Sequence, residues 1–451
     1  MTRRRWIVSG AAVGFVVVGV IWSRARGHSL VIETDGRINL GLPPFQNKWL
    51  PRWDWWLAAI GVGAMVAGVA LLRERITLRL TVIGSMILTA AWTALLAATG
   101  GWEGFTGSMG VSDEYLPQLE WIRANGWRAY FESFNNETLF STFPTHVRSH
   151  PPGMVTLFGG LDSIGLSGPR WATVAVLCVA ATIPLSIAVT VRSVAGRDLA
   201  RHAAVLVAIT PAAVFLGSTA DALFAAVAAA AIALVAVAAD RCSWPIALGA
   251  GLMAGAGVSL TYGVVPLVGI MAVALTIRLP HPNHRSGGVA SQDGLGVVRR
   301  AALLVPMGAG VLVVLGVWAL LGFNWFAGLS AVQRQYELDD AQQNRPFSYF
   351  VIANLVVFAC VLGPTVVASV GAARRDRLLW IVGPALVAVA VADLSGLSKS
   401  EVERIWLPFV PWITVAGAWL LIRIPPTWKW PALAAQIAAG VALQTLFFGT
   451  W

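Results

Sequence analysis

The sequence predicts an all-α protein that crosses a membrane many times. Of its 451 residues, 57% are hydrophobic and only 12% are charged, whereas soluble domains are about 45–50% apolar and about 25% charged. So few charged residues cannot cover a soluble globule of this size, which excludes a soluble enzyme, a disordered chain and a disulfide-rich secreted module. The net charge of +10 fits basic loops on one side of a bilayer, so we expect membrane lipids and no nucleic acid as partners.

About thirteen segments approach the roughly 20 apolar residues that a helix needs to cross a bilayer. They lie at 6–22, 54–72, 79–100, 169–191, 199–218, 220–239, 243–260, 262–277, 301–323, 348–370, 378–394, 405–422 and 431–448. Three Arg residues precede the first of them, and no small-residue cleavage site follows, so we interpret it as an uncleaved anchor.

The basic residues predict how the chain is oriented. If the N-terminus is cytoplasmic, the inner loops hold most of the Arg and Lys residues and few acids, apart from a basic first outer loop. The acidic residues then concentrate in the outer segments 101–168, 324–347 and 395–404. Because Ala, Val and Arg usage is typical of a high-GC bacterium, we expect a multi-pass protein of the bacterial inner membrane. The three acidic outer segments should meet if they form one extracytoplasmic site.

We divide the chain into three parts. Residues 1–78 form a two-span hairpin, residues 79–240 a core with the long outer loop 101–168, and residues 241–451 the remaining spans. In the outer loop, Asp113 can cap an amphipathic helix that lies flat in the headgroup layer. A second apolar helix over 154–164 is too short to span and is also expected at the interface.

Two motifs in this loop resemble those of a known superfamily. Asp113-Glu114 shortly follows a span, and His150-Pro151-Pro152-Gly153 comes after the amphipathic helix. The pair resembles the first outer loop of the GT-C glycosyltransferases, above all protein O-mannosyltransferases and lipid A aminoarabinose transferases. Asp221-Ala222-Leu223 resembles the start of a later span in that superfamily. The chain departs from the pattern in having Gly153 directly after the prolines and two extra spans before the loop.

The resemblance implies a GT-C-like fold and an inverting transfer of a sugar from polyprenyl phosphate to an acceptor hydroxyl at the outer face. Mannose or arabinofuranose would be the sugar in such a bacterium, and a glycan, glycolipid or protein the acceptor. The lipid-linked sugar serves as co-substrate. The resemblance implies no obligatory cofactor and no metal ligands, although it does not exclude a divalent ion.

The chemistry needs a base for the acceptor hydroxyl and cations for the leaving phosphate. The resemblance assigns the base to Asp113, whose alternative role is a helix cap. We assign acceptor binding or orientation of Asp113 to Glu114, whose alternative role is a favourable charge in the first turn of the helix. We assign phosphate binding to five cationic residues of the outer segments: Arg404, His150, Lys399, His146 and Arg148. The alternatives are a snorkelling Arg404 among surface acids and basic groups that contact lipid headgroups.

We assign acceptor or sugar binding to five further residues: Asp221, Tyr262, Glu337, Asp340 and Glu403. The alternatives are a helix-start charge at Asp221 and a solvated acidic face around Glu337. Asp393 lies in the last turn of a span, where the helix dipole disfavours an acid, so we expect it to have a partner such as Lys399 or Arg404. A transporter or lipid flippase is the alternative function, but these favour charges buried in mid-span and repeated halves, which the sequence does not show.

Overall fold

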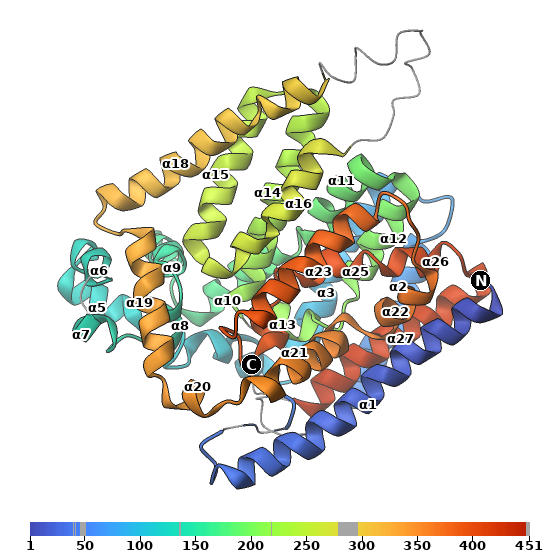
Figure 1. Cartoon of the computed structure of the whole chain (residues 1–451), viewed down its shortest axis with the longest axis horizontal. Coiled ribbons are helices and arrows are strands. Elements are labelled where there is room, and N and C mark those ends of the chain that lie inside the picture. The colour runs from blue at the N-terminus through green and yellow to red at the C-terminus, as the bar shows by residue number, and fades with distance from the viewer. Residues whose placement is uncertain are drawn as a thin grey trace.

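The computed structural model describes residues 1–38, 40, 42–45, 51–134, 137–217, 219–277 and 296–447. Within these ranges the chain forms helices and their connections, with isolated bridge residues but no strand (Figure 1). The predicted all-α fold is therefore confirmed for the part of the chain that is described.

The helices follow in chain order. The first three are α1 (Arg3–Glu33), α2 (Trp55–Leu71) and α3 (Leu78–Ala98). The long outer loop holds α4 (Gly101–Thr106), η1 (Gly107–Gly110), α5 (Gln118–Asn125), α6 (Trp127–Ser133), α7 (Glu137–Phe140), α8 (Thr145–Ser149) and α9 (Gly153–Ser163). The next group is α10 (Gly168–Ala180), α11 (Ile183–Ala195), α12 (Arg197–Ala208), α13 (Ala213–Leu216), α14 (Asp221–Arg241), α15 (Trp244–Leu260), η2 (Tyr262–Leu267) and α16 (Val268–Thr276). The last group is α18 (Leu304–Leu320), α19 (Trp325–Leu338), α20 (Asp340–Asn344), α21 (Phe347–Leu362), α22 (Pro364–Ala368), η3 (Ser369–Ala372), α23 (Leu379–Leu394), α24 (Val402–Ile405), α25 (Val410–Thr414), α26 (Gly417–Leu421) and α27 (Pro426–Leu446).

Five helices of the described residues are long and apolar enough to cross a membrane. They are α1, α3, the continuous pair Gly168–Ala195, α14 and Gly296–Leu320. A sixth candidate is α21 together with α22 and η3, which are bent by 103° at Gly363. The segments 199–218 and 405–422 are instead broken into short helices at turns that contain Pro211 and Pro408, since a proline disfavours helical backbone at the residue before it. The number of thirteen spans therefore stays a prediction.

The Ala-rich helix α14 lies at the centre of the bundle. It packs against α10, α11, α15 and α16, and small residues along it allow this close approach. The neighbouring pair α15 and α18 comes closer still, because a Cβ on Gly251 would lie 2.0 Å from the Met307 carbonyl oxygen. Gly310 faces α15 in the same way, with its ideal Cβ 2.6 Å from the Leu248 oxygen. Only glycine permits this backbone contact.

The bend between α21 and α22 has its own polar partner. Gly363 (φ +86°) opens the turn, and the Gln436 amide of α27 occupies the space that a Cβ there would need. Gln436 Nε2 donates to the Leu362 oxygen at 2.6 Å, and its Oε1 accepts from the Thr365 amide at 3.2 Å. The side chain therefore replaces helix hydrogen bonds that the bend breaks.

The outer loop differs from the prediction at its first helix. That helix, α5, begins at Gln118 after Pro117 and has no side-chain cap, so the interpretation of Asp113 as its cap is wrong. Proline fits the start of a helix because it lacks an amide proton. The second predicted helix is confirmed as α9.

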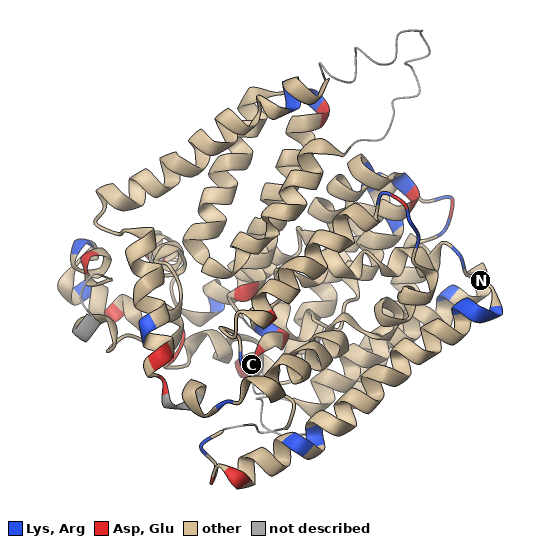
Figure 2. Ribbon diagram, in the orientation of Figure 1, with Lys and Arg blue, Asp and Glu red and all other residues tan. Residues whose placement is uncertain are grey.

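Charge is unevenly distributed over the molecule. Figure 2 shows basic residues at the N-terminus and along the right and upper edges, whereas acidic residues are more frequent near the centre and around the lower end of α19. The α2–α3 connection, which was predicted to be cytoplasmic, holds Arg73 and Arg75, and Arg197 begins α12 directly after the α11–α12 connection.

Candidate active site

Four ionisable side chains, three of them from distant parts of the chain, surround Arg404. We call Glu114, His146, Asp221, Glu401 and Arg404 the Arg404 cluster. Arg404 Nε lies 3.4 Å from Asp221 Oδ2, and Nη1 lies 3.6 Å from Glu114 Oε1. Nη2 lies 3.6 Å from Glu401 Oε2 and 3.0 Å from both ring nitrogens of His146. Arg404 is only 3% exposed, so one buried cation faces three carboxylates.

Glu114 is the carboxylate most affected by this burial. Its Oε1 lies 3.6 Å from Arg404 Nη1 and 3.4 Å from His146 Nε2, and its Oε2 is buried without a hydrogen-bond partner among the described residues. Burial raises the pKa of Glu114 to about 7, although Arg404 opposes the shift. The group therefore changes charge near neutral pH.

Both histidines of the loop are buried beside Tyr115. His150 Nδ1 lies 3.0 Å from the His146 carbonyl oxygen and 3.1 Å from the Tyr115 hydroxyl. Because a carbonyl only accepts, the His150 proton belongs on Nδ1, and Nε2 is the acceptor. Burial lowers the pKa of His150 to about 4, and burial together with Arg404 holds the pKa of His146 well below its usual value. Both rings are therefore neutral at pH 7.

Asp113 lies at the exposed edge of the cluster. Its side chain is exposed, and Oδ1 accepts a hydrogen bond from Thr145 Oγ1 at 3.1 Å. Its carbonyl oxygen accepts from the His146 amide at 3.0 Å, which joins the Asp113-Glu114 motif to α8. The structure therefore brings the two halves of the sequence motif together, with Asp113 open to solvent and Glu114 beneath it.

Residues 395–401, which we call the site loop, position Glu401 and Arg404. Ser400 (φ +88°) and Glu401 (φ +58°) are consecutive non-glycine residues with left-handed backbone, a conformation that costs about 1–2 kcal/mol per residue. Such strain persists only where the surroundings enforce it.

Asn354 of α21 supplies part of that enforcement. Its Nδ2 donates to the Ser398 oxygen at 2.7 Å and to Asp393 Oδ1 at 3.0 Å, and its Oδ1 accepts from the Ser400 amide at 3.3 Å. The expected partner of Asp393 was Lys399 or Arg404, but the structure shows Asn354 in that place. Asp393 and Asn354 are both buried, so the pair forms a rigid support beneath the site loop.

The other predicted site residues do not belong to the Arg404 cluster, and most of them contact groups outside it. Lys399 Nζ donates to the Gln342 oxygen at 3.1 Å, and Arg148 Nη1 donates to the Ser141 oxygen at 3.2 Å. Tyr262 packs its ring against Trp325 with centroids 5.1 Å apart. Glu337 is exposed on α19, Asp340 begins α20, and Glu403 is buried next to Arg404 in α24.

Sequence reasoning missed Asn354 and Tyr115. Asn354 is a lone amide within the apolar stretch of α21, and a polar side chain in such a helix is a signal for a functional or structural partner. Tyr115 directly follows the acidic pair, but its spacing fitted an apolar helix face equally well. Its hydroxyl contact with His150 depends on the folding of the loop.

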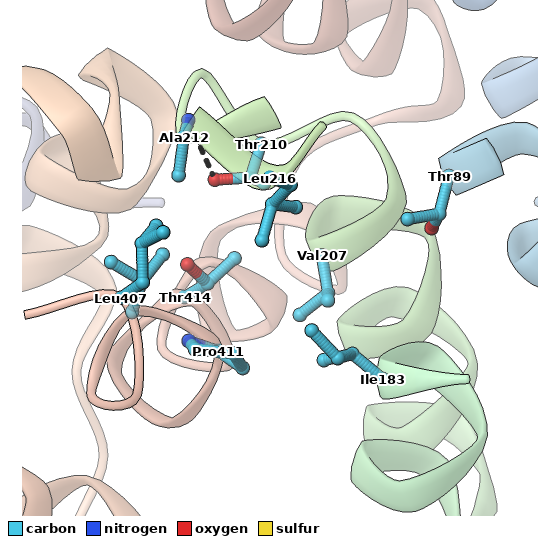
Figure 3. A pocket seen from close by; sticks show the side chains of 10 residues that line it. Thr89, Ile183, Val207, Thr210, Ala212, Leu216, Leu407, Pro411 and Thr414 are labelled. Carbon is cyan, nitrogen blue, oxygen red and sulfur yellow. Dashed lines mark hydrogen bonds between the residues drawn. The ribbon is translucent and has the colours of Figure 1, made fainter. Parts of the chain in front are cut away.

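The broken segments enclose a cavity of about 10 Å³ between α3, α11, α13 and α25 (Figure 3). Its lining includes Leu216, Leu407 and Thr414. A space of this volume holds about one water molecule at most, so it is no substrate pocket.

Comparisons with protein-family models, with curated proteins and with solved structures give no match to this chain.

Proposed function

We propose that the protein is a membrane glycosyltransferase that moves a sugar from a polyprenyl phosphate to an acceptor hydroxyl on the extracytoplasmic side of the bacterial inner membrane. The observation that carries the proposal is the meeting of Asp113-Glu114, His146, His150, Asp221 and Arg404. All of them except Asp221 belong to 101–168 and 395–404, which are two of the three outer segments that were expected to form one site. The proposal includes the GT-C likeness, the thirteen spans and the cytoplasmic N-terminus.

Asp113 is the base in this proposal. Its carboxylate is exposed and can meet an incoming acceptor, whereas Glu114 is 4% exposed and held by Arg404. The acceptor oxygen attacks the anomeric carbon and gives its proton to Asp113. The bond between the anomeric carbon and the phosphate oxygen breaks from the opposite side, so the configuration inverts and polyprenyl phosphate leaves with the bonding electron pair.

The donor phosphate needs hydrogen-bond donors at the moment it leaves. Arg404 can bind it with two nitrogens, but only by exchanging at least one of its present carboxylate partners. The Tyr115 hydroxyl of the outer loop is a further donor, whereas His150 is not, because its one proton is used on the His146 carbonyl oxygen. Mannose or arabinofuranose is the proposed sugar, and an envelope glycan, glycolipid or protein is the proposed acceptor.

The location of the ionisable cluster favours this proposal over a transporter or flippase. Asp221 stands at the first residue of α14, and Arg404 lies in the four-residue helix α24. Transport sites are typically built near the middle of discontinuous spans. Because Glu114 and His146 of the cluster lie in the connection between α3 and α10 and not in a candidate span, the cluster fits chemistry on a lipid headgroup better than passage through the bilayer.

The test is sugar transfer by the purified protein in lipid nanodiscs, with polyprenyl-phosphate mannose and arabinofuranose as donors. We expect Asp113→Asn to lower kcat by about 10²–10⁴-fold, the usual contribution of a general base, without changing the melting temperature. Asp162→Asn is the matched control, because Asp162 is an acid of the same loop in a surface pair with Arg123 at 2.9 Å.

Full activity of Asp113→Asn would remove Asp113 as the base. If the wild-type protein transfers neither sugar but moves a labelled lipid across the bilayer of a proteoliposome, the proposal of a transferase is replaced by that of a flippase.

A further inference from the structure

A groove of about 870 Å³ runs along the side of the molecule between α2 and α3. Small side chains form much of its lining, among them Gly63, Ala67, Ala70, Gly84 and Ala91. Small residues on two neighbouring helices leave a continuous trough where larger side chains would have closed it. Both helices belong to the apolar part of the chain, so the trough would open toward lipid.

The groove is longer than one leaflet of a bilayer. Its lining extends from Asp54 to Leu71 along α2 and from Gly84 to Thr99 along α3, which corresponds to roughly 22–25 Å at the helical rise. The hydrocarbon core is about 30 Å thick, so a single leaflet provides about 15 Å. An acyl chain anchored in one leaflet would fill little more than half of the groove, whereas a long isoprenoid chain could fill all of it.

Polarity marks one end of the groove. Asp54 and Thr99 lie there, and the lining between that end and Leu71 is otherwise apolar except for two Trp rings. Asp54 Oδ1 caps α2 by accepting from the Trp56 amide at 2.9 Å. A ligand that fits has one polar head and one long apolar chain.

The polar end is also the end nearest the candidate site along the chain. After Thr99, the chain passes through α4 and η1 to Asp113. On the other face of the same turns of α3, an ideal Cβ on Gly217 would lie 2.8 Å from Thr93 Cγ2 and 3.7 Å from Ala97 Cβ. Gly217 lies four residues before Asp221, so α3 separates the groove on one face from the segment that leads to Asp221 on the other.

We propose that the α2–α3 groove holds the isoprenoid chain of a polyprenyl phosphate, with the phosphate beyond the Asp54–Thr99 end and toward the outer loop. This inference rests on the proposed function for the role of that lipid as donor. α2 is one of the two predicted spans that precede the core with the sequence motifs. In this proposal its role is to form one wall of the lipid-binding groove.

The test fills the groove at its middle. Gly63 has open space where a Cβ would stand, so Gly63→Phe can place a ring in the groove without a clash of its first atom. Gly14→Phe in α1 is the matched control, since its Cβ position is equally open but lies on another helix. Ala67→Phe, one turn further along α2, provides a second variant if Gly63→Phe does not fold.

The measurement is the dissociation constant of a fluorescent long-chain polyprenyl phosphate in nanodiscs, together with cross-linking by a polyprenyl phosphate that carries a benzophenone at its far end. We expect Gly63→Phe to weaken long-chain binding about threefold or more and to remove cross-links to α2 and α3. The effect is modest because a chain gains little hydrophobic free energy on moving from lipid into a protein groove. A two-isoprene phosphate, which is too short to reach Gly63, should bind both variants equally.

Equal long-chain binding by Gly63→Phe and Gly14→Phe, or cross-links confined to other helices, would overturn the inference. A phospholipid with a benzophenone on its acyl chain that cross-links along the whole groove and competes with the polyprenyl probe would also overturn the inference. If the long-chain probe binds in the groove while the protein transfers no sugar, the proposed function fails and the groove assignment stands.

Discussion

At the scale of single residues, Arg404 is the central group of the candidate site. Sequence reasoning placed it at the end of a span, next to acids that could hold it, and the contact with Glu401 fits that expectation. The contacts with Glu114 and Asp221 could not be predicted, because they join segments that are far apart in the chain. Only the assembled fold reveals that one guanidinium is shared among three carboxylates.

Removing this cation should destabilise the protein strongly. Arg404→Ala leaves Glu114 and Asp221 buried without their countercharge, and breaking a buried pair costs about 3–5 kcal/mol. We expect a clearly lowered melting temperature in detergent. Arg128→Ala is the control, because Arg128 and Glu132 form an exposed pair at 2.8 Å and such pairs contribute about 1 kcal/mol or less. Similar losses in both variants would contradict a countercharge role for Arg404.

The raised pKa of Glu114 predicts a pH-dependent stability. A carboxyl whose pKa is about 7 when folded and near its ordinary value of about 4.3 when unfolded binds the proton more tightly in the folded protein. Its contribution to the free energy of unfolding is therefore full below about pH 4 and is lost as the pH rises through 7. His146 and His150, with lowered pKa values, act in the opposite direction, since they lose stability as the pH falls below 6.5.

The two effects are separated by comparing wild type with Glu114→Gln. We expect the melting temperature of Glu114→Gln, relative to wild type, to rise between pH 5 and pH 8, because the variant lacks the carboxylate that becomes charged and buried. The measurement is thermal unfolding at several pH values in the same detergent. Parallel curves for the two proteins would contradict the raised pKa.

At the scale of elements, the site loop shows how local strain is maintained. Hydrophobic runs predict where helices lie, and most residues of the predicted span segments are helical, although 199–218, 348–370 and 405–422 are interrupted. They do not predict the left-handed pair Ser400-Glu401, because neither residue is a glycine or asparagine. The support from Asn354 reaches the loop from another helix, and propensity contains no information about such a contact.

A glycine should relieve strain at the first of these positions. Ser400→Gly removes the Cβ at φ +88°, and Ser400 Oγ has no hydrogen-bond partner among the described residues. We expect the free energy of unfolding to stay equal or rise by up to about 1 kcal/mol. Ser395→Gly is the control at φ −63°. It should lose about 0.5–1 kcal/mol from the backbone, in addition to the hydrogen bonds of Ser395 Oγ with the Ala392 oxygen and the Leu397 amide. A larger loss at Ser400 than at Ser395 would argue against backbone strain.

Loss of the Asn354 amide should release the site loop. Asn354→Ala removes the hydrogen bonds to Ser398, Ser400 and Asp393, and an unsatisfied buried partner costs about 1–3 kcal/mol. We expect a lowered melting temperature and a rise in amide hydrogen exchange that is confined to residues 395–404. Uniform exchange throughout the molecule would indicate general unfolding instead of a local support.

At the scale of the whole molecule, composition predicts the all-helical architecture because apolar backbone must satisfy its own hydrogen bonds. Composition cannot give the number of crossings, since the backbone breaks at Pro211, Gly363 and Pro408 interrupt segments that are apolar enough to span. The domain boundaries at 78 and 240 also stay predictions, because α1 packs against α21 and α2 packs against α27. Contacts between the beginning and the later parts of the chain depend on the tertiary fold.

The orientation can be tested with a native cysteine. Cys242 is exposed at the end of α14, which the charge pattern places on the cytoplasmic side. We expect a membrane-impermeant maleimide to leave Cys242 unmodified in intact cells and to modify it after permeabilisation. Ser112→Cys, in the exposed outer loop, should react in intact cells. The reverse pattern would invert the topology and place the candidate site in the cytoplasm.

The amide of Gln436 at the α21–α22 bend has a consequence for how the molecule is assembled. Until α27 arrives, the peptide groups of Leu362 and Thr365 lack the partner they have in the finished structure. A ribosome makes α27 more than sixty residues after the bend. While the intervening chain is synthesised, the Leu362 carbonyl and the Thr365 amide must therefore bind water or stay without a hydrogen-bond partner. The last helix of the described chain thus completes the backbone hydrogen bonds of an earlier one.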